Sequence, residues 1–299
     1  MFSALDVKKL REKTGCGMMD CKNALVHSDG DMDKAIDYLR EKGLAAATKK
    51  SGRIASEGIA FSMSEPSGGS IVEVNSETDF VARNDEFKAF VSSCASLVLK
   101  NKVSNVEDLM DVPSDGKKVR DVLNEKILKI GENIKIRRCD FFEGVTSSYF
   151  HAGGKIAVLV KFDCDSSVYE NKKFKEMSKD IAMQIAAAHP LYLKKEDVPS
   201  DVLDHERKIL TEQAISQGKP QNIAERMVEG RLKKYYQENC LLDQVFVKDS
   251  SMNVLQYVEK ISGEIGSKIS VSKFIRYERG EGLEKKVDNF AQEVADILK

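Results

Sequence analysis

The chain has 299 residues, 41% of them hydrophobic and 32% charged, and its 47 Lys and Arg residues nearly balance its 48 Asp and Glu residues. This composition is typical of a globular protein with ample material for a core. The net charge of −1 argues against a protein that binds nucleic acid through bulk neutralisation of phosphates. No apolar run approaches the roughly 18 residues that a membrane helix needs, and residues 1–10 lack the apolar region of a secretory signal. We therefore expect a cytoplasmic protein of roughly two domains that contacts neither membrane nor nucleic acid.

The sequence predicts neither a metal site nor a catalytic site. Six cysteines and four histidines are scattered without a Cys-x-x-Cys pair, whereas a zinc site needs ligands at short spacing. Gly153-Gly154-Lys155 suggests a phosphate-binding loop, but Tyr149 replaces the first glycine of that pattern and Ile156 its final serine or threonine. A nucleophile elbow and a zinc-protease motif are missing as well. We therefore expect a protein that is not an enzyme and has no cofactor.

Residues 1–43 have the pattern of three short helices, which predicts a small bundle. The first helix should end at Gly15, which suits a left-handed cap, and Asp31 is a good N-cap for the third. The third helix should stop at Gly43. Residues 45–58 carry three basic residues and no periodicity, so we expect a linker there.

A pattern of glycine, strand and helix then occurs twice. The first copy runs from Gly58 to a helix near Phe87, and the second runs from Gly144 to a helix near Phe174. Three landmarks are offset by 86, 85 and 87 residues between the copies. Such constant offsets predict a duplicated unit of hairpin and helix, and hence a core of two related subdomains.

The stretch Glu73–Asn84 (EVNSETDFVARN) lies where the first copy passes from strand to helix. It begins as a buried, β-branched strand after a turn at Gly68-Gly69, and it then becomes polar. Phe80 lies at or beside the tip of this junction, where a loop held between packed elements can present an aromatic side chain to a partner. The alternative stays open that Thr78 or Asp79 caps the next helix and that Phe80 packs inward.

Later segments complete the predicted fold. Residues 119–127 look helical, and Ile134 and Ile136 alternate with basic residues as in an edge strand. Helices on either side of Gly218-Lys219-Pro220 predict an antiparallel hairpin, and residues 269–277 read as a strand. An apolar stripe spaced by threes and fours predicts a C-terminal helix. The stripe is formed by Leu283, Val287, Phe290, Ala291, Val294, Ile297 and Leu298.

Two motifs carry a resemblance to a known family. The first is Leu10–Leu25 (LREKTGCGMMDCKNAL), and the second is the stretch Glu73–Asn84. In this order, and with this gap, they resemble the two signatures of the elongation factor Ts family, whose members are guanine-nucleotide exchange factors for elongation factor Tu. The resemblance covers essentially the whole chain.

The resemblance implies a surface that binds elongation factor Tu. Asp79 and Phe80 would wedge between helices of the partner's G domain and disturb the Mg²⁺ and phosphate side of its nucleotide pocket. Beside the implied His151, the run Ala152-Gly153-Gly154 departs from the glycine-alanine-arginine common in the family, so a charge is missing. The implied contact residues are Lys22, Thr78, Asp79, Phe80, Val81, Ile130, Gly131 and His151.

The expected fold class is α+β, and the resemblance adds a division of the chain into domains. The N-terminal bundle would be of the ubiquitin-associated type, and the helical hairpin would be a dimerisation element that protrudes from the core. The expected units are an N-terminal helical module with linker (1–52), a first core subdomain (53–140), a second core subdomain (141–190 and 232–279), the hairpin (191–231) and a C-terminal helical module (280–299).

Two other classes of function stay open at this point. A ubiquitin-associated-like adaptor would use only the first 43 residues and leave the duplicated core idle. A nucleic-acid binder would need local basic patches, since the net charge of −1 disfavours it. Partner pull-down and salt-dependent retention on RNA would distinguish these classes from an exchange factor.

Overall fold

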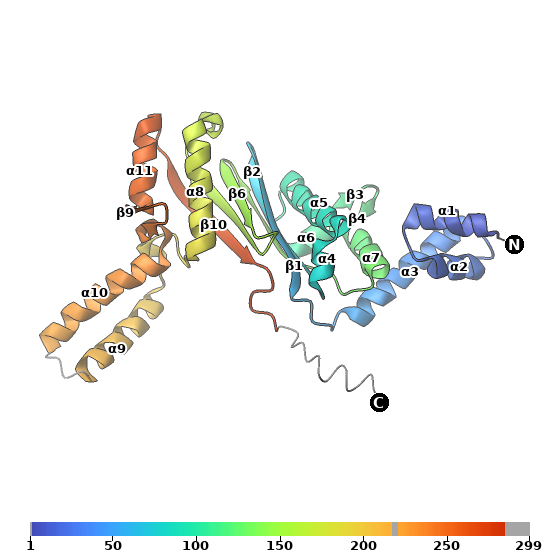
Figure 1. Ribbon diagram of the computed structural model, residues 1–299, viewed down its shortest axis with the longest axis horizontal. Coiled ribbons are helices and arrows are strands. Elements are labelled where there is room, and N and C mark those ends of the chain that lie inside the picture. Colours follow the sequence, from blue (N-terminus) through green and yellow to red (C-terminus); the bar gives the residue numbers. More distant parts are fainter. Residues whose placement is uncertain (1, 217–220, 285–299) are drawn as a thin grey trace.

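The computed structural model describes residues 2–216 and 221–284. As expected, the protein has an α+β fold. In the described residues two three-stranded antiparallel sheets face each other, with strand orders β1-β2-β5 and β6-β7-β10. Helix α5 covers the first sheet and helix α8 covers the second, so the molecule is layered as helix, sheet, sheet and helix (Figure 1).

The N-terminal bundle consists of α1 (Ala4–Thr14), α2 (Met18–His27) and α3 (Met32–Lys50). Gly15 caps α1 with φ 67°, and the Asp31 carboxylate accepts hydrogen bonds at the start of α3, as predicted. The predicted stop at Gly43 is wrong, because α3 continues to Lys50. Gly43 instead lets α3 pack closely on α7, where a Cβ would lie 3.3 Å from the carbonyl oxygen of Asn124. The expected linker is therefore shorter than residues 45–58.

The first half of the core extends from the linker to the end of the first sheet. Its elements are β1 (Glu57–Glu65), β2 (Gly68–Ser76), α4 (Asp79–Arg83), α5 (Asp85–Asn101), α6 (Val106–Asp111), β3 (Pro113–Ser114), β4 (Lys117–Lys118), α7 (Val119–Ile130) and β5 (Lys135–Glu143). Strand β2 is buried along its whole length because it lies between β1 and β5. Ile134 and Ile136 are both buried, the first directly before the edge strand β5 and the second within it, as their alternation predicts.

The second half repeats the hairpin and the long helix. Its elements are β6 (Thr146–His151), β7 (Ile156–Asp163), η1 (Ser166–Glu170), α8 (Lys172–Ala188), η2 (Lys195–Asp197), α9 (Ser200–Ser216), α10 (Gln221–Asn239), η3 (Leu241–Asp243), β8 (Val245–Phe246), β9 (Asp249–Asn253), α11 (Val254–Ile265) and β10 (Ser270–Glu278). Helices α5 and α8 are both 17 residues long, and each begins at an asparagine cap, Asn84 and Asn171. The hairpin and helix predicted to recur are therefore both present twice.

The two sheets touch through a small apolar layer. It contains Ala60, Ile71, Phe142, Ala157, Leu159 and Tyr277. Gly68 and Gly69 were expected in a turn, but both lie in β2, and the chain turns at Pro66 and Ser67. At Gly69 a Cβ would lie 2.5 Å from Cδ1 of Leu159, so the glycine is needed for the close approach of the sheets.

The helical hairpin of α9 and α10 protrudes from the second half (Figure 1). Its predicted break at residues 218–220 lies outside the described residues. Helix α10 continues to Asn239, beyond the boundary expected at residue 231. The stripe predicted for a C-terminal helix also lies outside the described residues, except for Leu283, which follows a turn after β10. The division into domains at the expected boundaries remains a proposal.

Candidate partner-binding site

Phe80 lies in the first turn of the short helix α4, and 81% of its surface is exposed. The Thr78 side chain caps this helix by accepting a hydrogen bond from the N–H of Val81 at 3.4 Å. Val81 and Ala82, in contrast, pack against the core of the first half. Of the two alternatives left open by the sequence, Thr78 thus acts as a cap, but Phe80 does not pack inward.

Glu132 holds the chain immediately before α4. Its carboxylate accepts hydrogen bonds from the backbone N–H of Glu77 at 3.1 Å and of Thr78 at 3.0 Å, and from the Thr78 hydroxyl at 2.6 Å. Glu132 follows Gly131, which ends α7 in the left-handed region with φ 84°. Residues 130–132 and 77–78 are therefore neighbours in space.

The Glu77 carboxylate makes the return contact. It accepts a hydrogen bond from the backbone N–H of Asn133 at 2.6 Å and forms an ion pair with Arg53 at 3.4 Å. The Asn133 side chain in turn donates to the carbonyl of Arg53 at 2.8 Å. We call the reciprocal contacts of Glu77 with Asn133 and of Glu132 with Glu77 and Thr78 the carboxylate clamp. The clamp ties the start of α4 to the end of α7.

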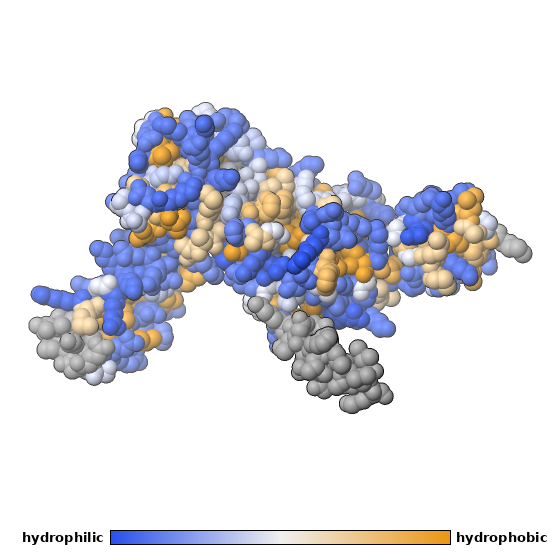
Figure 2. Space-filling view, in the orientation of Figure 1, coloured by the Kyte–Doolittle hydropathy of each residue, from blue (hydrophilic) through white to orange (hydrophobic). Residues whose placement is uncertain are grey.

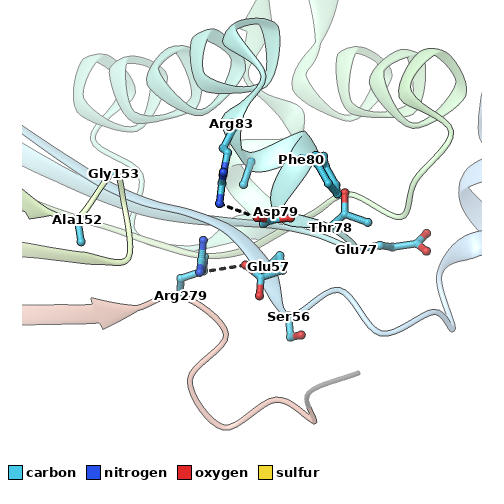
Figure 3. Close-up of a pocket in the computed structure, with 11 residues that line it drawn as sticks. Ser56, Glu57, Glu77, Thr78, Asp79, Phe80, Arg83, Ala152, Gly153 and Arg279 are labelled. Atoms are coloured by element: carbon cyan, nitrogen blue, oxygen red, sulfur yellow. Dashed lines mark ion pairs between the residues drawn. The ribbon is translucent and has the colours of Figure 1, made fainter. Parts of the chain in front are cut away.

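A cavity of about 740 Å³ opens beside α4. Figure 3 shows that its walls come from four places: the start of β1 at Ser56 and Glu57, the stretch Glu77–Arg83, the β6–β7 turn at Ala152 and Gly153, and Arg279 after β10. Two ion pairs cross its surface, between Asp79 and Arg83 at 2.8 Å and between Glu57 and Arg279 at 2.9 Å. The cavity thus combines paired charges with one exposed aromatic ring at its edge.

Comparisons with known proteins agree on one family. A family model described as Elongation factor TS matches residues 77–281. Elongation factor Ts of Clostridium perfringens strain 13 is 50% identical to this chain over 303 residues, which cover 99% of each sequence. Elongation factor Ts of Clostridium botulinum strain Alaska E43 is 47% identical and covers 100% of this chain and 99% of its own length.

The chain belongs to the elongation factor Ts family.

In this elongation factor Ts family member, the implied residues outside α4 lie at different distances from the cavity. Ile130 is half-buried and packs against the core of the first half, whereas Gly131 is exposed. His151 is exposed at the end of β6, directly before the turn that lines the cavity, and its Nδ1 lies 2.9 Å from the Tyr149 hydroxyl. These three positions surround the site without forming its wall.

Lys22 lies apart from these residues, on helix α2 of the N-terminal bundle (Figure 1). Its side chain is exposed, and so are those of Met18, Met19 and Val26 on the same helix. Spacing of three and four residues places Lys22 beside these apolar side chains. Figure 2 shows orange surface over this bundle and over the centre of the molecule, separated by hydrophilic residues. The structure therefore places Lys22 on a separate surface.

Several residues of the site were not found by sequence reasoning. Glu132 directly follows the implied Gly131, and an acidic residue after a helix-ending glycine can reach the N–H groups of a neighbouring loop. Glu57 and Arg279 gave no local signal, because they pair only when the end of β10 reaches the start of β1. Buried Glu73 lies within the second motif, but its pairing with Arg137 and Arg138 was not predicted.

Within residues 2–216 and 221–284 no group of three or more His, Cys, Asp or Glu side chains is placed to hold a metal ion. Among the same residues no helix is long and apolar enough to cross a membrane. Burial raises the pKa of the Cys94 and Cys139 thiols to about 12, so both thiols are protonated near neutral pH.

Proposed function

We propose that this chain is a guanine-nucleotide exchange factor that binds elongation factor Tu and promotes the release of GDP, so that GTP can rebind during translation elongation. Membership of the elongation factor Ts family supports this proposal. The observation that carries it is Phe80, an 81% exposed aromatic side chain on a backbone that is capped and clamped. An exposed large apolar side chain on an ordered loop is typical of a contact with a partner.

The mechanism is differential binding, without covalent chemistry. An exchange factor binds the nucleotide-free GTPase more tightly than the nucleotide-bound form, and by linkage each ligand weakens the binding of the other. Phe80 would enter between helices of the G domain, where an aromatic ring buries a large apolar area and loses little rotamer entropy. Asp79 would exchange its ion pair with Arg83 for hydrogen bonds in the gap. Because that pair is largely exposed, its loss would cost little, about 1 kcal/mol or less.

The proposed contact surface has two parts. The main part lies around the cavity and consists of Thr78, Asp79 and Phe80, which line it, with Val81, Ile130, Gly131 and His151 beside them. The second part is the exposed face of α2 with Lys22. The Mg²⁺ and the nucleotide belong to the GTPase, so this chain needs no cofactor of its own. A cytoplasmic location follows from a role in translation.

The test is release of a fluorescent GDP from purified elongation factor Tu. Elongation factor Tu of Clostridium perfringens is a suitable partner, and the elongation factor Ts of that organism, 50% identical to this chain, is the positive control. With this chain at one tenth of the Tu concentration, release should accelerate and continue through many turnovers. If release stays at the spontaneous rate while the control accelerates it, the proposal is wrong.

We also propose that the helical hairpin expected at residues 191–231 mediates self-association. Its two ends meet, because the backbone N–H groups of Leu191 and Tyr192 both donate to the carbonyl of Asn239, at 2.9 and 3.0 Å. Residues 195–236 can therefore be replaced by a short Gly-Ser linker without separating the ends. The shortened chain should sediment as a folded monomer at concentrations where the full chain forms a dimer. A full chain that is monomeric throughout would contradict this proposal.

A further inference from the structure

The backbone N–H groups between β2 and α4 have no hydrogen-bond partners within a sheet or a helix. Pairing of β2 with its neighbours ends at Asn75 and Ser76, and α4 begins at Asp79. The N–H groups of Glu77 and Thr78 lie between these elements, where neither a sheet nor a helix satisfies them. Both donate to one oxygen of Glu132 instead. The orientation of the Phe80 helix relative to the sheet therefore depends on a side chain from another segment.

The same carboxylate also reaches the cap of α4. Its second oxygen accepts the Thr78 hydroxyl proton at 2.6 Å, and the Thr78 oxygen in turn accepts the N–H of Val81. A chain of contacts thus runs from Glu132 through Thr78 to the turn of helix that holds Phe80. Hydrogen bonds to an ionised carboxylate are stronger than those between neutral groups.

From this geometry we infer that Glu132 is a positioning residue for nucleotide exchange, which fixes the start of α4 so that Phe80 meets the GTPase in one orientation. The inference rests on the proposed exchange function. Glu132 need not touch the partner, since its carboxylate is taken up by Glu77 and Thr78. The neighbouring Gly131 contributes to the same positioning, because its left-handed conformation turns the chain from α7 toward the loop before α4.

The expected size of the effect follows from populations. If the loop is released, only a fraction of molecules holds Phe80 in the orientation that binds, and the apparent affinity falls by that fraction. Three hydrogen bonds to one carboxylate are lost in Glu132→Ala, so we expect the second-order rate constant of GDP release to fall about tenfold or more. In Glu132→Gln one amide oxygen can still accept both backbone N–H groups, and the amide N–H can donate to Thr78, so most of the rate should return.

The experiment compares four variants in the fluorescent-GDP assay: Glu132→Ala, Glu132→Gln, Phe80→Ala and the double variant Glu132→Ala/Phe80→Ala. The matched control is Glu143→Ala, which removes a glutamate whose exposed ion pair with Lys102 lies at the far end of β5. Amide hydrogen exchange of the segment 76–84 is measured on each variant without partner, so that the carboxylate clamp is assessed separately from nucleotide exchange.

The inference is supported if Glu132→Ala slows GDP release, Glu132→Gln restores it, and hydrogen exchange of residues 77–81 rises in Glu132→Ala but not in Glu143→Ala. In the Phe80→Ala background, Glu132→Ala should cause no further loss, because nothing remains to be positioned. The inference is overturned if Glu132→Ala leaves either the rate of GDP release or the hydrogen exchange of residues 77–81 unchanged. It is also overturned if Glu132→Ala slows GDP release equally with and without Phe80. If the unmodified chain itself fails to accelerate release, the proposed function is wrong, whatever the hydrogen exchange of the loop.

Discussion

The buried carboxylate of Glu73 accepts a hydrogen bond of 2.8 Å from the backbone N–H of Gly280, which joins β2 to the segment after β10. Glu73 is fully buried, and its carboxylate also pairs with Arg137 at 3.1 Å and with Arg138 at 2.6 Å. Gly280 has φ 69°, and a Cβ there would clash with the carbonyl oxygen of Ser56. These contacts of Gly280 fix the position of the preceding residue, Arg279, in the cavity wall.

Glu73→Gln should destabilise the protein by about 3 kcal/mol, because two partly buried arginines lose their counter-charge. The free energy of unfolding in urea measures this change. The control is Glu281→Gln, since Glu281 is more exposed. It pairs with Arg138 at 3.1 Å and only distantly, at 3.9 Å, with buried Arg276, which has a closer partner in Glu278, so the change should cost no more than about 1 kcal/mol. Equal losses in the two variants would mean that burial of Glu73 has no energetic consequence.

Phe80→Ala should slow GDP release from elongation factor Tu at least tenfold, by an order-of-magnitude estimate, while the melting temperature hardly changes. The side chain is 81% exposed, so its removal leaves no cavity. Phe87→Ala is the matched control, because Phe87 is fully buried only seven positions away. That change should cost about 3–5 kcal/mol of stability. A comparable loss of stability in Phe80→Ala would mean that the Phe80 side chain belongs to the core and contradict the prediction.

Local sequence signals predicted most of the fold. The caps at Gly15 and Asp31, the repeat of hairpin and long helix, and the helix that became α7 all depend on residues close together in the chain. The same holds for Phe80, whose place at a strand-to-helix junction was visible from the polar break before it. The errors arose where a glycine serves packing between distant segments. Gly43 and Gly69 look like stops or turns, yet both permit close approach of elements far apart in sequence.

Helix α11 was missed although its signals were present. Asn253 and Gln256 form a capping box, and Val254 and Val258 are buried at helical spacing. The ion pair of Glu57 with Arg279 had no such signal, since no pattern in the sequence pairs residues at opposite ends of the core. The role of Glu132 was missed for a related reason. Its partners are backbone N–H groups, which every non-proline residue has.

Glu86→Gln should lower stability at neutral pH but not in acid. Hydrogen bonds from Lys126 at 2.5 Å and Lys129 at 2.7 Å hold the pKa of the Glu86 carboxyl below its ordinary value of 4.5. Because the folded-state pKa is the lower one, the stabilisation is present above the unfolded-state pKa and is lost as the pH falls through the folded-state pKa. The side chain is about one-third exposed, so the effect at pH 7 should be about 1 kcal/mol or less.

Urea unfolding at pH 7 and at about pH 3 measures this difference. The gap between the parent chain and Glu86→Gln should narrow at the lower pH, because the parent carboxyl takes up a proton as the pH falls through its folded-state pKa. Glu143→Gln serves as a control for a more exposed pair. There Lys102 lowers the pKa of the Glu143 carboxyl in the same direction, but the pair connects no two helices. A gap for Glu86→Gln that persists unchanged in acid would exclude the ion pairs with α7 as its cause.

Gly69→Ala should destabilise the contact between the two sheets. A Cβ at this position would lie 2.5 Å from Cδ1 of Leu159 and 2.7 Å from Oγ1 of Thr146, and both neighbours are buried in the second sheet. Overpacking of this kind costs about 1–3 kcal/mol.

Gly263→Ala is the opposite case, since no atom lies within 4 Å of its Cβ position and the residue is in helix α11. There alanine should stabilise by up to about 1 kcal/mol. Differential scanning calorimetry of both variants checks the two signs, and a stabilising Gly69→Ala would show that the sheets can separate at no cost.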